Sequence, residues 1–388
     1  MKNVMVLYGT RPEAIKLAPV VKALERSQHL EATVTVTGQH REMLDQVNEL
    51  FEIEPHRDLD IMVPGASLDE IAARALTSVS EVLRSDRPDV VVIQGDTSTA
   101  FIAGLAAFYE RIPVVHVEAG LRTGNLLSPF PEEANRQLAA RITDLHLAPT
   151  ATSKANLIAE NVPESSIAVT GNTVIDALQD ALAVPVEFSD PAVGSAVESG
   201  KPYVLVTAHR RESWGEPMKN AMAAVREVAL AHPDLRWVLP MHRNPVVREV
   251  ILEMLTDVPT VLLTESLTYH EFCHAMKNSF LLLTDSGGVQ EEAPSLGKPV
   301  LVMRDTTERP EAVLAGTVEL VGTTSATVRS ALTRLIVDDG AYSAMANAVN
   351  PYGDGHAAIR SVAAIEAMFG LGRRMTDFRP AIDDDRKS

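Results

Sequence analysis

Residues 280–303 read FLLLTDSGGVQEEAPSLGKPVLVM, and this stretch decides the fold class. An apolar run at 280–283 meets a Ser286-Gly287-Gly288 turn, after which come a short amphipathic segment and a second apolar run. This order is typical of the strand, turn, helix and strand of a parallel α/β sheet. Glycines let a ligand approach the backbone, and the free N–H groups of a helix start suit a phosphate. Taken alone, the turn is equally compatible with a plain sheet connection.

The same unit recurs through the rest of the chain, where apolar runs alternate with amphipathic segments. The expected strands are 4–8, 33–37, 90–94, 114–117, 145–148, 167–170, 203–207, 236–239, 261–263, 280–284, 300–303 and 318–321. The expected helices are 13–26, 43–51, 68–84, 98–110, 132–142, 152–160, 217–231, 245–255, 269–277, 289–296, 326–337, 341–347 and 356–369. The strand runs are apolar throughout, as in strands buried on both faces of a parallel sheet. We therefore predict an α/β fold with two Rossmann-like, doubly wound parallel sheets.

Two segments break this rhythm. Residues 184–202 contain three prolines and two glycines, which predicts an irregular linker between the two sheets. Residues 371–388 have charge clusters and no apolar period, which predicts a flexible tail.

Composition narrows the class of protein. The formal charge of −17 argues against a nucleic-acid partner held by bulk charge, although a few arginines can still form a local anion site. The single cysteine, Cys273, fits a reducing compartment. The N-terminus has no basic-then-apolar signal region, and no apolar run approaches the ~18 residues of a membrane span. We expect a cytoplasmic protein without a membrane or nucleic-acid partner.

Polar residues that follow the strands of the first half are the first candidates for a site, since ligands bind beyond the carboxyl ends of parallel strands. Arg11 and Lys16 can face a common anion near a helix start, or they can be a solvated basic pair. Asp96 comes directly after a strand, where capping of the next helix is the simpler interpretation. Glu118 follows a buried run and is either a proton carrier or the partner of Arg122.

A third carboxylate lies at the helix start after Pro131. Glu132 and Arg136 are four residues apart, so they form either a surface ion pair or a carboxylate that an arginine orients toward a ligand.

The second half supplies basic turns in the same places. His209 follows a strand and precedes two arginines, which makes it a candidate clamp or proton carrier, although a lone histidine at a strand end is more often structural. Arg309 precedes a proline at a helix start, as Arg11 does. Histidines, cysteines and carboxylates lack metal-ligand spacing, which predicts acid–base chemistry without a metal. Together these residues suggest a nucleotide-diphosphate site facing a carboxylate-rich chemical site.

At this level of detail the sequence resembles the non-hydrolysing UDP-N-acetylglucosamine 2-epimerases of bacteria, from about residue 1 to 370. The motifs that carry the resemblance are GTRPEAIK (9–16), QHR (39–41), GDT (95–97), HVEAGLR (116–122), PEEANR (131–136), HRRE (209–212), TDSGGVQEEAPSLG (284–297), RDTTERP (304–310) and NPYGDG (350–355).

The resemblance implies a GT-B-like architecture with the active site in a cleft between the two domains. The domains would be 1–171 with the C-terminal helix 356–370, and the UDP-binding domain 172–355. It also implies a homodimer, no cofactor, and a place in the synthesis of cell-surface polysaccharide precursors. The implied reaction is reversible C2 epimerisation of UDP-GlcNAc to UDP-ManNAc, by anti elimination of UDP to 2-acetamidoglucal and syn re-addition.

Residue roles carry over by motif. The implied catalytic residues are Asp96, Glu118, Glu132 and His209. The implied substrate-binding residues are Arg11, Lys16, Arg136, Phe272, Ser286, Gly287, Gly288, Glu292 and Arg309. Within that set, Glu292 would hold the ribose hydroxyls, Phe272 would lie at the uracil, and Arg136 would orient Glu132.

Some members of that family are activated by a second UDP-GlcNAc. The implied contacts of such an activator are Gln39, Glu133, Arg210 and His242. Regulated members have glutamine where this chain has Glu42, and a basic residue near Ala66 is missing, so the sequence does not decide on activation.

Three other functions share the expected fold or ligand. A hydrolysing epimerase would release free ManNAc and UDP. A GT-B glycosyltransferase would need an acceptor groove, for which we find no segment. A nucleotide-sugar sensor would not need three carboxylates near one site.

Overall fold

The computed structural model describes residues 1–38, 41–61, 65–210 and 213–381. The chain divides into two compact units. Unit 1 consists of Met1–Ala181 and Tyr352–Arg379, and unit 2 contains Leu182–Pro351. Unit 1 is therefore assembled from two pieces of chain, whereas residues 182–351 form one continuous piece.

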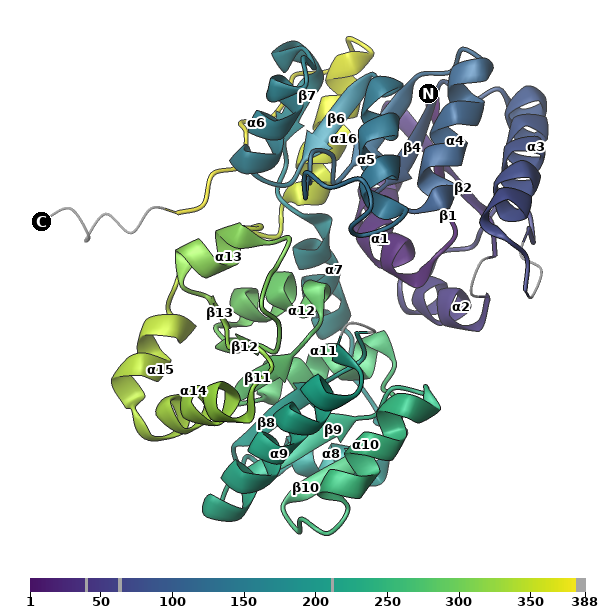
Figure 1. The fold of residues 1–388 in the computed structure, drawn as a ribbon. Coiled ribbons are helices and arrows are strands. Elements are labelled where there is room, and N and C mark those ends of the chain that lie inside the picture. The colour runs from purple at the N-terminus through teal and green to yellow at the C-terminus, as the bar shows by residue number, and fades with distance from the viewer. Residues whose placement is uncertain (39–40, 62–64, 211–212, 382–388) are drawn as a thin grey trace, which may run out of the picture. The chain divides into compact units, whose positions relative to one another are not determined.

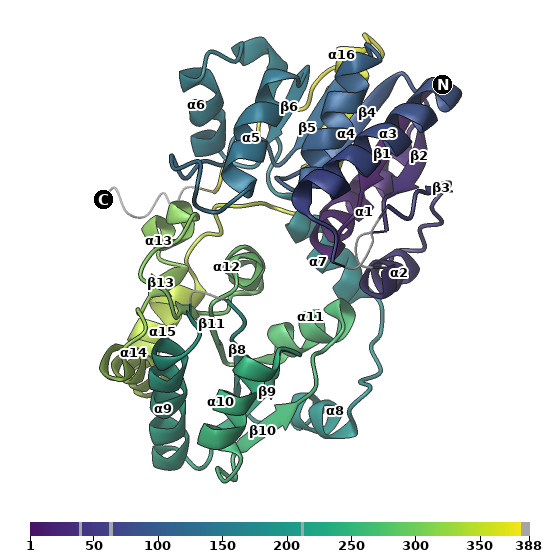
Figure 2. The same cartoon turned by 45° about the vertical axis from the view of Figure 1, so that its right-hand side comes forward.

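Unit 1 is built on a seven-stranded parallel sheet with the order β3-β2-β1-β4-β5-β6-β7. Its strands are β1 (Lys2–Tyr8), β2 (Leu30–Val36), β3 (Arg57–Asp58), β4 (Val90–Gln94), β5 (Val114–Val117), β6 (Leu145–Ala148) and β7 (Ile167–Val169). Its helices are α1 (Arg11–Glu25), α2 (Arg41–Leu50), α3 (Leu68–Asp86), α4 (Ser98–Tyr109), α5 (Glu132–Arg141), α6 (Ala151–Ala159), η1 (Glu164–Ser166), α7 (Thr173–Ala183, whose last turn passes into unit 2) and α16 (Ala357–Met368). Helices α1, α2 and α16 cover one face and α3 to α6 the other, as right-handed crossovers require (Figures 1 and 2).

Unit 2 repeats the plan with a six-stranded parallel sheet of order β10-β9-β8-β11-β12-β13. Its strands are β8 (Tyr203–Thr207), β9 (Arg236–Pro240), β10 (Val261–Thr264), β11 (Leu281–Thr284), β12 (Val300–Val302) and β13 (Val318–Leu320). Its helices are α8 (Pro191–Glu198), α9 (Glu216–Ala231), α10 (Pro245–Leu255), α11 (Tyr269–Asn278), α12 (Gly287–Glu292), η3 (Ala293–Leu296), α13 (Pro310–Ala315), α14 (Ser325–Val337) and α15 (Asp339–Ala346). Buried side chains of α9, α10 and α14 pack with those of β8, β9 and β11 into one core around Trp237.

Local sequence explains where the helices begin. Thr10, Ser67 and Thr268 each form a capping box with a glutamate three residues later, at the starts of α1, α3 and α11. Among the described residues, no helix has both the length and the apolar character needed to cross a bilayer.

The predicted α/β class with two doubly wound parallel sheets is confirmed, and each predicted strand has a counterpart. The two-residue β3 and the helices α7 and α13 were missed. The predicted irregular linker 184–202 is wrong in part, because it contains α8. Asp190 caps this helix by accepting a hydrogen bond from the N–H of Ala192 at 2.8 Å, and Pro191 occupies its first position. Pro191 therefore begins a helix rather than interrupting one.

The segment after α16 also differs from the expected tail. The N–H of Phe378 donates to the carbonyl oxygen of Val169 at 2.8 Å, and Asp377 accepts from the N–H of Val169 at 3.1 Å. The ring of Phe378 is buried and lies 5.5 Å from the Arg360 guanidinium. The segment up to Phe378 is thus attached to β7 through one backbone hydrogen bond and the Asp377 carboxylate, which no periodic pattern reveals. Residues 382–388 lie outside the described part of the chain.

Candidate active site

Each sheet has one place where the strand order reverses, between β1 and β4 in unit 1 and between β8 and β11 in unit 2. In open parallel sheets, ligands bind beyond the carboxyl ends of the strands at this place. The loops that follow these four strands begin at Gly9, Gly95, Ala208 and Asp285. Of the residues that the sequence singled out, Asp96, His209 and Ser286 lie in these loops, and Arg11 begins the helix that follows the first of them.

In unit 1, the buried Glu13 joins two of these loops. Its carboxylate accepts hydrogen bonds from the N–H groups of Gly9 (3.1 Å) and Thr10 (2.8 Å) and from the hydroxyl of Thr97 (2.6 Å). Burial raises the pKa of Glu13, and these hydrogen bonds oppose the rise. The start of α1, where Arg11 is the first residue, is thereby fixed against the loop after β4.

Glu118 follows β5 in a strained backbone conformation. Its φ angle is 64°, a left-handed conformation that few residues other than glycine adopt. Its Oε2 accepts hydrogen bonds from the Lys16 ammonium and from Gln94 Nε2, the latter at 3.0 Å. The side chains of Lys16 and Glu118 are 12% and 7% exposed. Of the two interpretations left open by the sequence, the pair with Arg122 is wrong, because Arg122 binds Glu160 at 2.6 and 2.9 Å.

Asp96 lies in the loop after β4 and is held from α5. Arg136 Nη2 donates to Asp96 Oδ2 at 2.5 Å, and Asn135 Nδ2 donates to the Asp96 carbonyl oxygen at 2.9 Å. The cap of α4 is the side chain of Thr97, which accepts from the N–H of Ala100 at 3.0 Å. The Asp96 carboxylate is therefore not used as a helix cap.

The two glutamates at the start of α5 have different surroundings. Within the helix, Arg136 pairs with Glu133 at 3.0 Å rather than with Glu132, which corrects the expected pairing. Glu133 is 0% exposed and also accepts from the N–H of Thr123 and from Gln137 Nε2, both at 3.0 Å. Burial alone would raise the pKa of Glu133, but these donors lower it. A second nucleotide sugar could contact the Glu133 carboxylate only by replacing one of these hydrogen-bond donors. Glu132 Oε2 is buried without a hydrogen-bond partner among the described residues.

In unit 2, the SGG turn opens α12 as the sequence predicts, although the helix starts at Gly287 and tightens to a 3-10 turn at Ala293, just before Pro294. Ser286 is the N-cap residue, and its N–H donates to Thr284 Oγ1 at 2.9 Å.

A set of arginines surrounds one carboxylate near this helix start. Arg309 donates to Glu308 at 2.6 Å and to Glu291 at 2.8 Å, and Arg304 donates to Glu308 at 3.0 Å. The Arg210 guanidinium lies 3.8 Å from Glu308. Burial works to raise the pKa of Glu308, but the three guanidinium groups lower it to about 2. The cluster is basic and preorganised, and Glu308 and Glu291 are members that the sequence analysis missed.

Glu292, the last residue of α12, is oriented from α11. Tyr269 donates its hydroxyl to Glu292 Oε1 at 3.0 Å. Burial and the neighbouring carboxylate raise the pKa of Tyr269 well above its ordinary value. Phe272 lies on the same helix, α11, and is half-buried.

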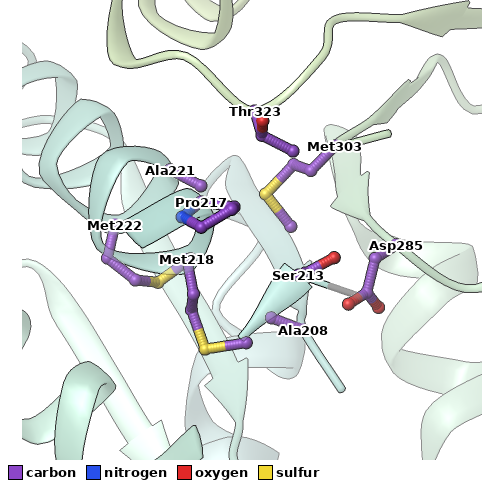
Figure 3. Close-up of a pocket in the computed structure, with 9 residues that line it drawn as sticks. All are labelled: Ala208, Ser213, Pro217, Met218, Ala221, Met222, Asp285, Met303 and Thr323. Atoms are coloured by element: carbon purple, nitrogen blue, oxygen red, sulfur yellow. The ribbon is translucent and has the colours of Figure 1, made fainter. Parts of the chain in front are cut away.

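His209, in the loop after β8, meets the buried Asp285, in the loop after β11. Asp285 Oδ1 lies 2.9 Å from His209 Nδ1, and Oδ2 accepts from the N–H groups of His209 and Arg210, both at 2.8 Å. The His242 ring stacks near His209, with centroids 6.1 Å apart. Asp285 also lines a small cavity of about 10 Å³ beside Met218, Met222 and Met303 (Figure 3). Sequence reasoning gave Asp285 no role, although it stands directly before the SGG turn.

No group of three or more histidine, cysteine, aspartate or glutamate side chains within the described ranges could hold a metal ion. Gln39, one of the expected activator contacts, lies outside the described residues.

Comparison with known proteins identifies the family. A family model described as UDP-N-acetylglucosamine 2-epimerase matches residues 22–366. This chain belongs to the UDP-N-acetylglucosamine 2-epimerase family. The Escherichia coli (strain K12) UDP-N-acetylglucosamine 2-epimerase is 51% identical over 377 residues, which cover 94% of this chain and 98% of that protein. The Yersinia pestis enzyme of the same name is 52% identical, with coverage of 94% and 98%.

Solved structures agree with this assignment. UDP-GlcNAc 2-epimerase from Neisseria meningitidis, bound to UDP-GlcNAc, has a TM-score of 0.86 at 47% identity and covers 95% of this chain and 100% of its own. S. aureus MnaA, solved with UDP, has a TM-score of 0.89 at 47% identity, with coverage of 97% and 100%. A kitacinnamycin glycotransferase, 14% identical with a TM-score of 0.61, shares the fold alone. The predicted GT-B-like class is confirmed.

The residues expected from the epimerase motifs fall into two groups. Unit 1 brings together Lys16 with Glu118, and Asp96 with Arg136 and Glu133. Unit 2 brings together Gly287 with Arg309, and His209 with His242. The partners that were missed all stand within or next to quoted motifs or helix starts; they are Glu13, Gln94, Tyr269, Asp285, Glu291 and Glu308. A carboxylate or amide beside a motif was the available signal.

Proposed function

We propose that this epimerase interconverts UDP-GlcNAc and UDP-ManNAc by anti elimination of UDP and syn re-addition, without hydrolysis. Family membership supports the reaction class, and the relative from Neisseria meningitidis binds UDP-GlcNAc. The observation that carries the proposed mechanism is Glu118, a carboxylate held in a strained conformation by Lys16 and Gln94 at the end of β5. Strain of this kind persists where the surrounding structure fixes a side chain for function.

The proposed first step breaks the C2–H and C1–O bonds of the sugar. A carboxylate of unit 1 accepts the proton from C2, the C–H electron pair forms the C1=C2 bond, and the C1–O pair leaves with UDP. The products of this step are 2-acetamidoglucal and UDP. In the return step a UDP oxygen adds to C1, and a proton is delivered to C2 on the opposite face. Glu118 is our candidate for proton transfer at C2, and Asp96 and Glu132 complete the acid–base set.

In this proposal unit 2 stabilises the leaving group. Charge develops on the diphosphate as the C1–O bond breaks, and preorganised donors are most effective where charge develops. The start of α12 and the guanidinium of Arg309 are such donors. Arg11, at the start of α1 in unit 1, is proposed to join them. Glu292, oriented by Tyr269, would accept hydrogen bonds from the ribose hydroxyls.

The test is incubation of the protein with UDP-GlcNAc in deuterated water, followed by proton NMR. The proposal expects UDP-ManNAc together with loss of the C2 proton signal from both sugars. Free ManNAc and UDP would instead indicate a hydrolysing enzyme. A mixture that stays unchanged would contradict the proposal and favour a sensor or a transferase that requires an acceptor.

The role of Glu118 has a separate test. Glu118→Gln keeps the side-chain size but cannot accept the C2 proton. We expect UDP binding, measured by calorimetry, to persist while C2 exchange falls on the order of 10²-fold or more. Exchange at the wild-type rate in this variant would remove Glu118 from the mechanism.

We also propose that the enzyme is a homodimer, which the family resemblance implies. Light scattering coupled to size-exclusion chromatography would distinguish a dimer from the 42.0 kDa chain.

A further inference from the structure

The contact between His209 and Asp285 constrains which imidazole nitrogen can carry a proton. Asp285 is 0% exposed, and its Oδ2 is occupied by the N–H groups of His209 and Arg210. Burial works to raise the pKa of Asp285, but its contacts with His209 and Arg210 lower it, so the group is a carboxylate at neutral pH. Asp285 Oδ1 is buried 2.9 Å from His209 Nδ1 but has no aligned hydrogen bond among the described residues. A carboxylate has no proton to donate, so a hydrogen bond across this contact forms only with the proton on His209 Nδ1.

We propose that Asp285 is a positioning residue that holds His209 with its proton on Nδ1 and presents Nε2 to the diphosphate of the bound nucleotide sugar. The inference rests on the proposed function for the identity of that ligand. Hydrogen bonding at one imidazole nitrogen sets the tautomer and the ring orientation at the other, as in carboxylate–histidine pairs of hydrolases. When Nε2 takes up a proton, the carboxylate balances the charge of the imidazolium.

The surroundings leave the carboxylate few other partners. Asp285 lines a small cavity together with Met218, Met222 and Met303 (Figure 3). The volume of this cavity, about 10 Å³, is close to the smallest that holds a single water molecule. Within the described ranges, the polar contacts of the Asp285 carboxylate are with His209 and Arg210 in the loop after β8. The imidazole is 38% exposed, so the ring has an open side for a ligand.

Two other charged or titratable groups near His209 that the structure describes, His242 and Arg210, have contacts of their own. The His242 ring is stacked 6.1 Å away, and its Nδ1 accepts from the N–H of Asn244 at 3.2 Å. Arg210, the next residue, extends toward Glu308. In the part of the chain that the structure describes, the side chain closest to His209 Nδ1 by these contacts is the Asp285 carboxylate.

Asp285→Asn gives a sharp test because it is nearly isosteric. The amide oxygen can take the place of Oδ2 and accept both backbone N–H groups, so the loop keeps its anchor. The amide nitrogen then faces His209 Nδ1 as a donor, which forces the proton to Nε2. In a protease triad the same exchange lowers kcat about 10⁴-fold through the wrong tautomer. We expect a fall of at least ~10²-fold in kcat for epimerisation with a much smaller change in KM.

Two further variants separate positioning from a general structural role. In a His209→Gln background, Asp285→Asn should have almost no further effect on kcat, because the residue through which it acts is gone. Met222→Leu changes the same cavity without touching His209 and should leave kcat unchanged. An equal loss from Asp285→Asn in both backgrounds would overturn the proposal.

A measurement that does not depend on enzyme activity tests the role of Asp285 separately from the proposed function. With ¹⁵N-histidine labelling, and His209→Gln to assign the signal, the nitrogen shifts report which ring nitrogen carries the proton. We expect Nδ1–H in the wild-type protein and Nε2–H in Asp285→Asn. An Nε2–H tautomer in the wild type would refute the role of Asp285. If the wild-type protein shows the Nδ1–H tautomer but does not exchange the C2 proton, the proposed function is refuted and the role of Asp285 is not.

Discussion

Glycine is needed at position 287 because the Arg309 guanidinium leaves no room for a side chain there, and not because of the backbone conformation. A Cβ at this position would lie 2.6 Å from Nη1 and 2.9 Å from Cζ of Arg309. Gly287→Ala must therefore displace a guanidinium that is bonded to Glu291 and Glu308. We expect UDP affinity, measured by titration calorimetry, to fall about tenfold, which corresponds to about 1.4 kcal/mol.

Gly194→Ala is the matched control for this prediction. A Cβ there would meet Phe188 at 3.5 Å, an ordinary contact, in the interior of α8. It should leave UDP binding unchanged and raise stability by roughly 0.5–1 kcal/mol. UDP binding by Gly287→Ala at wild-type strength would show that Arg309 is not needed where the structure places it.

The placement of candidate residues at strand ends could be predicted from the sequence, but their pairings could not. Position after a strand pointed to Asp96, Glu118 and His209, because parallel strands bring their ends together. Which side chain each one meets depends on the loop conformations, and Lys16 is 102 residues from Glu118. Adjacent helix residues point about 100° apart. Sequence alone could therefore not say that Glu133, and not Glu132, faces Arg136.

At the scale of elements, α16 is attached to unit 1 by a carboxylate on α7. Asp176 accepts hydrogen bonds from the N–H groups of Ala357 (3.2 Å) and Ala358 (2.8 Å), the first residues of α16. Asp176→Ala should therefore lower the stability of this helix by about 1–2 kcal/mol. Hydrogen–deuterium exchange should increase across 357–368 more than elsewhere.

The exposed Asp180, one turn further along α7, provides the control. Asp180→Ala should leave exchange in α16 unchanged. If Asp176→Ala also left it unchanged, packing against α1 alone would account for the position of α16.

Two buried histidines make the sheet of unit 1 sensitive to acid. His116 in β5 pairs in register with His146 in β6, and burial lowers their pKa values to about 4 and about 3. A lowered histidine pKa stabilises the fold above the unfolded value of about 6.5, and this stabilisation is lost as pH falls toward the folded value. For His146 the free energy of unfolding should fall by about 1.4 kcal/mol per pH unit below pH 6.5.

A comparison of variants isolates the contribution of His146 from those of the buried carboxylates, which also titrate as the pH falls. The difference in unfolding free energy between the wild type and His146→Gln should shrink by about 2 kcal/mol between pH 6.5 and 5.0. Urea denaturation at both pH values measures it, and the exposed His29→Gln serves as the control. A difference that does not change with pH would mean that His146 is protonated equally in both states.

Most elements could be predicted because burial on both faces gives parallel strands an unbroken apolar pattern. The exceptions lack such a pattern. Strand β3 has two exposed residues, Arg57 and Asp58, that carry no periodic signal. The segment that ends at Phe378 is held by one backbone hydrogen bond and by a single carboxylate, that of Asp377, neither of which gives a periodic signal.

At the scale of the molecule, one unit is formed by two separate pieces of chain and the other mainly by one continuous piece. Unit 1 needs both Met1–Ala181 and Tyr352–Arg379, whereas Leu182–Pro351 is continuous. The large core around Trp237 is contained in that continuous piece. Both of its ends are fixed internally. The carbonyl oxygen of Val184 accepts from His270 and His274, each at 3.0 Å, and Asn350 donates to the carbonyl oxygen of Glu291 at 3.2 Å.

These features predict that residues 182–351 fold alone. A continuous unit with its own core and fixed ends has the properties of an independent domain. The isolated fragment should unfold cooperatively and bind UDP, since Arg309, Glu292 and the start of α12 all lie within it. It should show no C2 exchange, because Glu118 is in unit 1. Thermal denaturation and calorimetry with UDP measure both properties. A folded fragment without UDP binding, when the full chain binds UDP, would mean that residues of unit 1 are needed to hold the nucleotide itself.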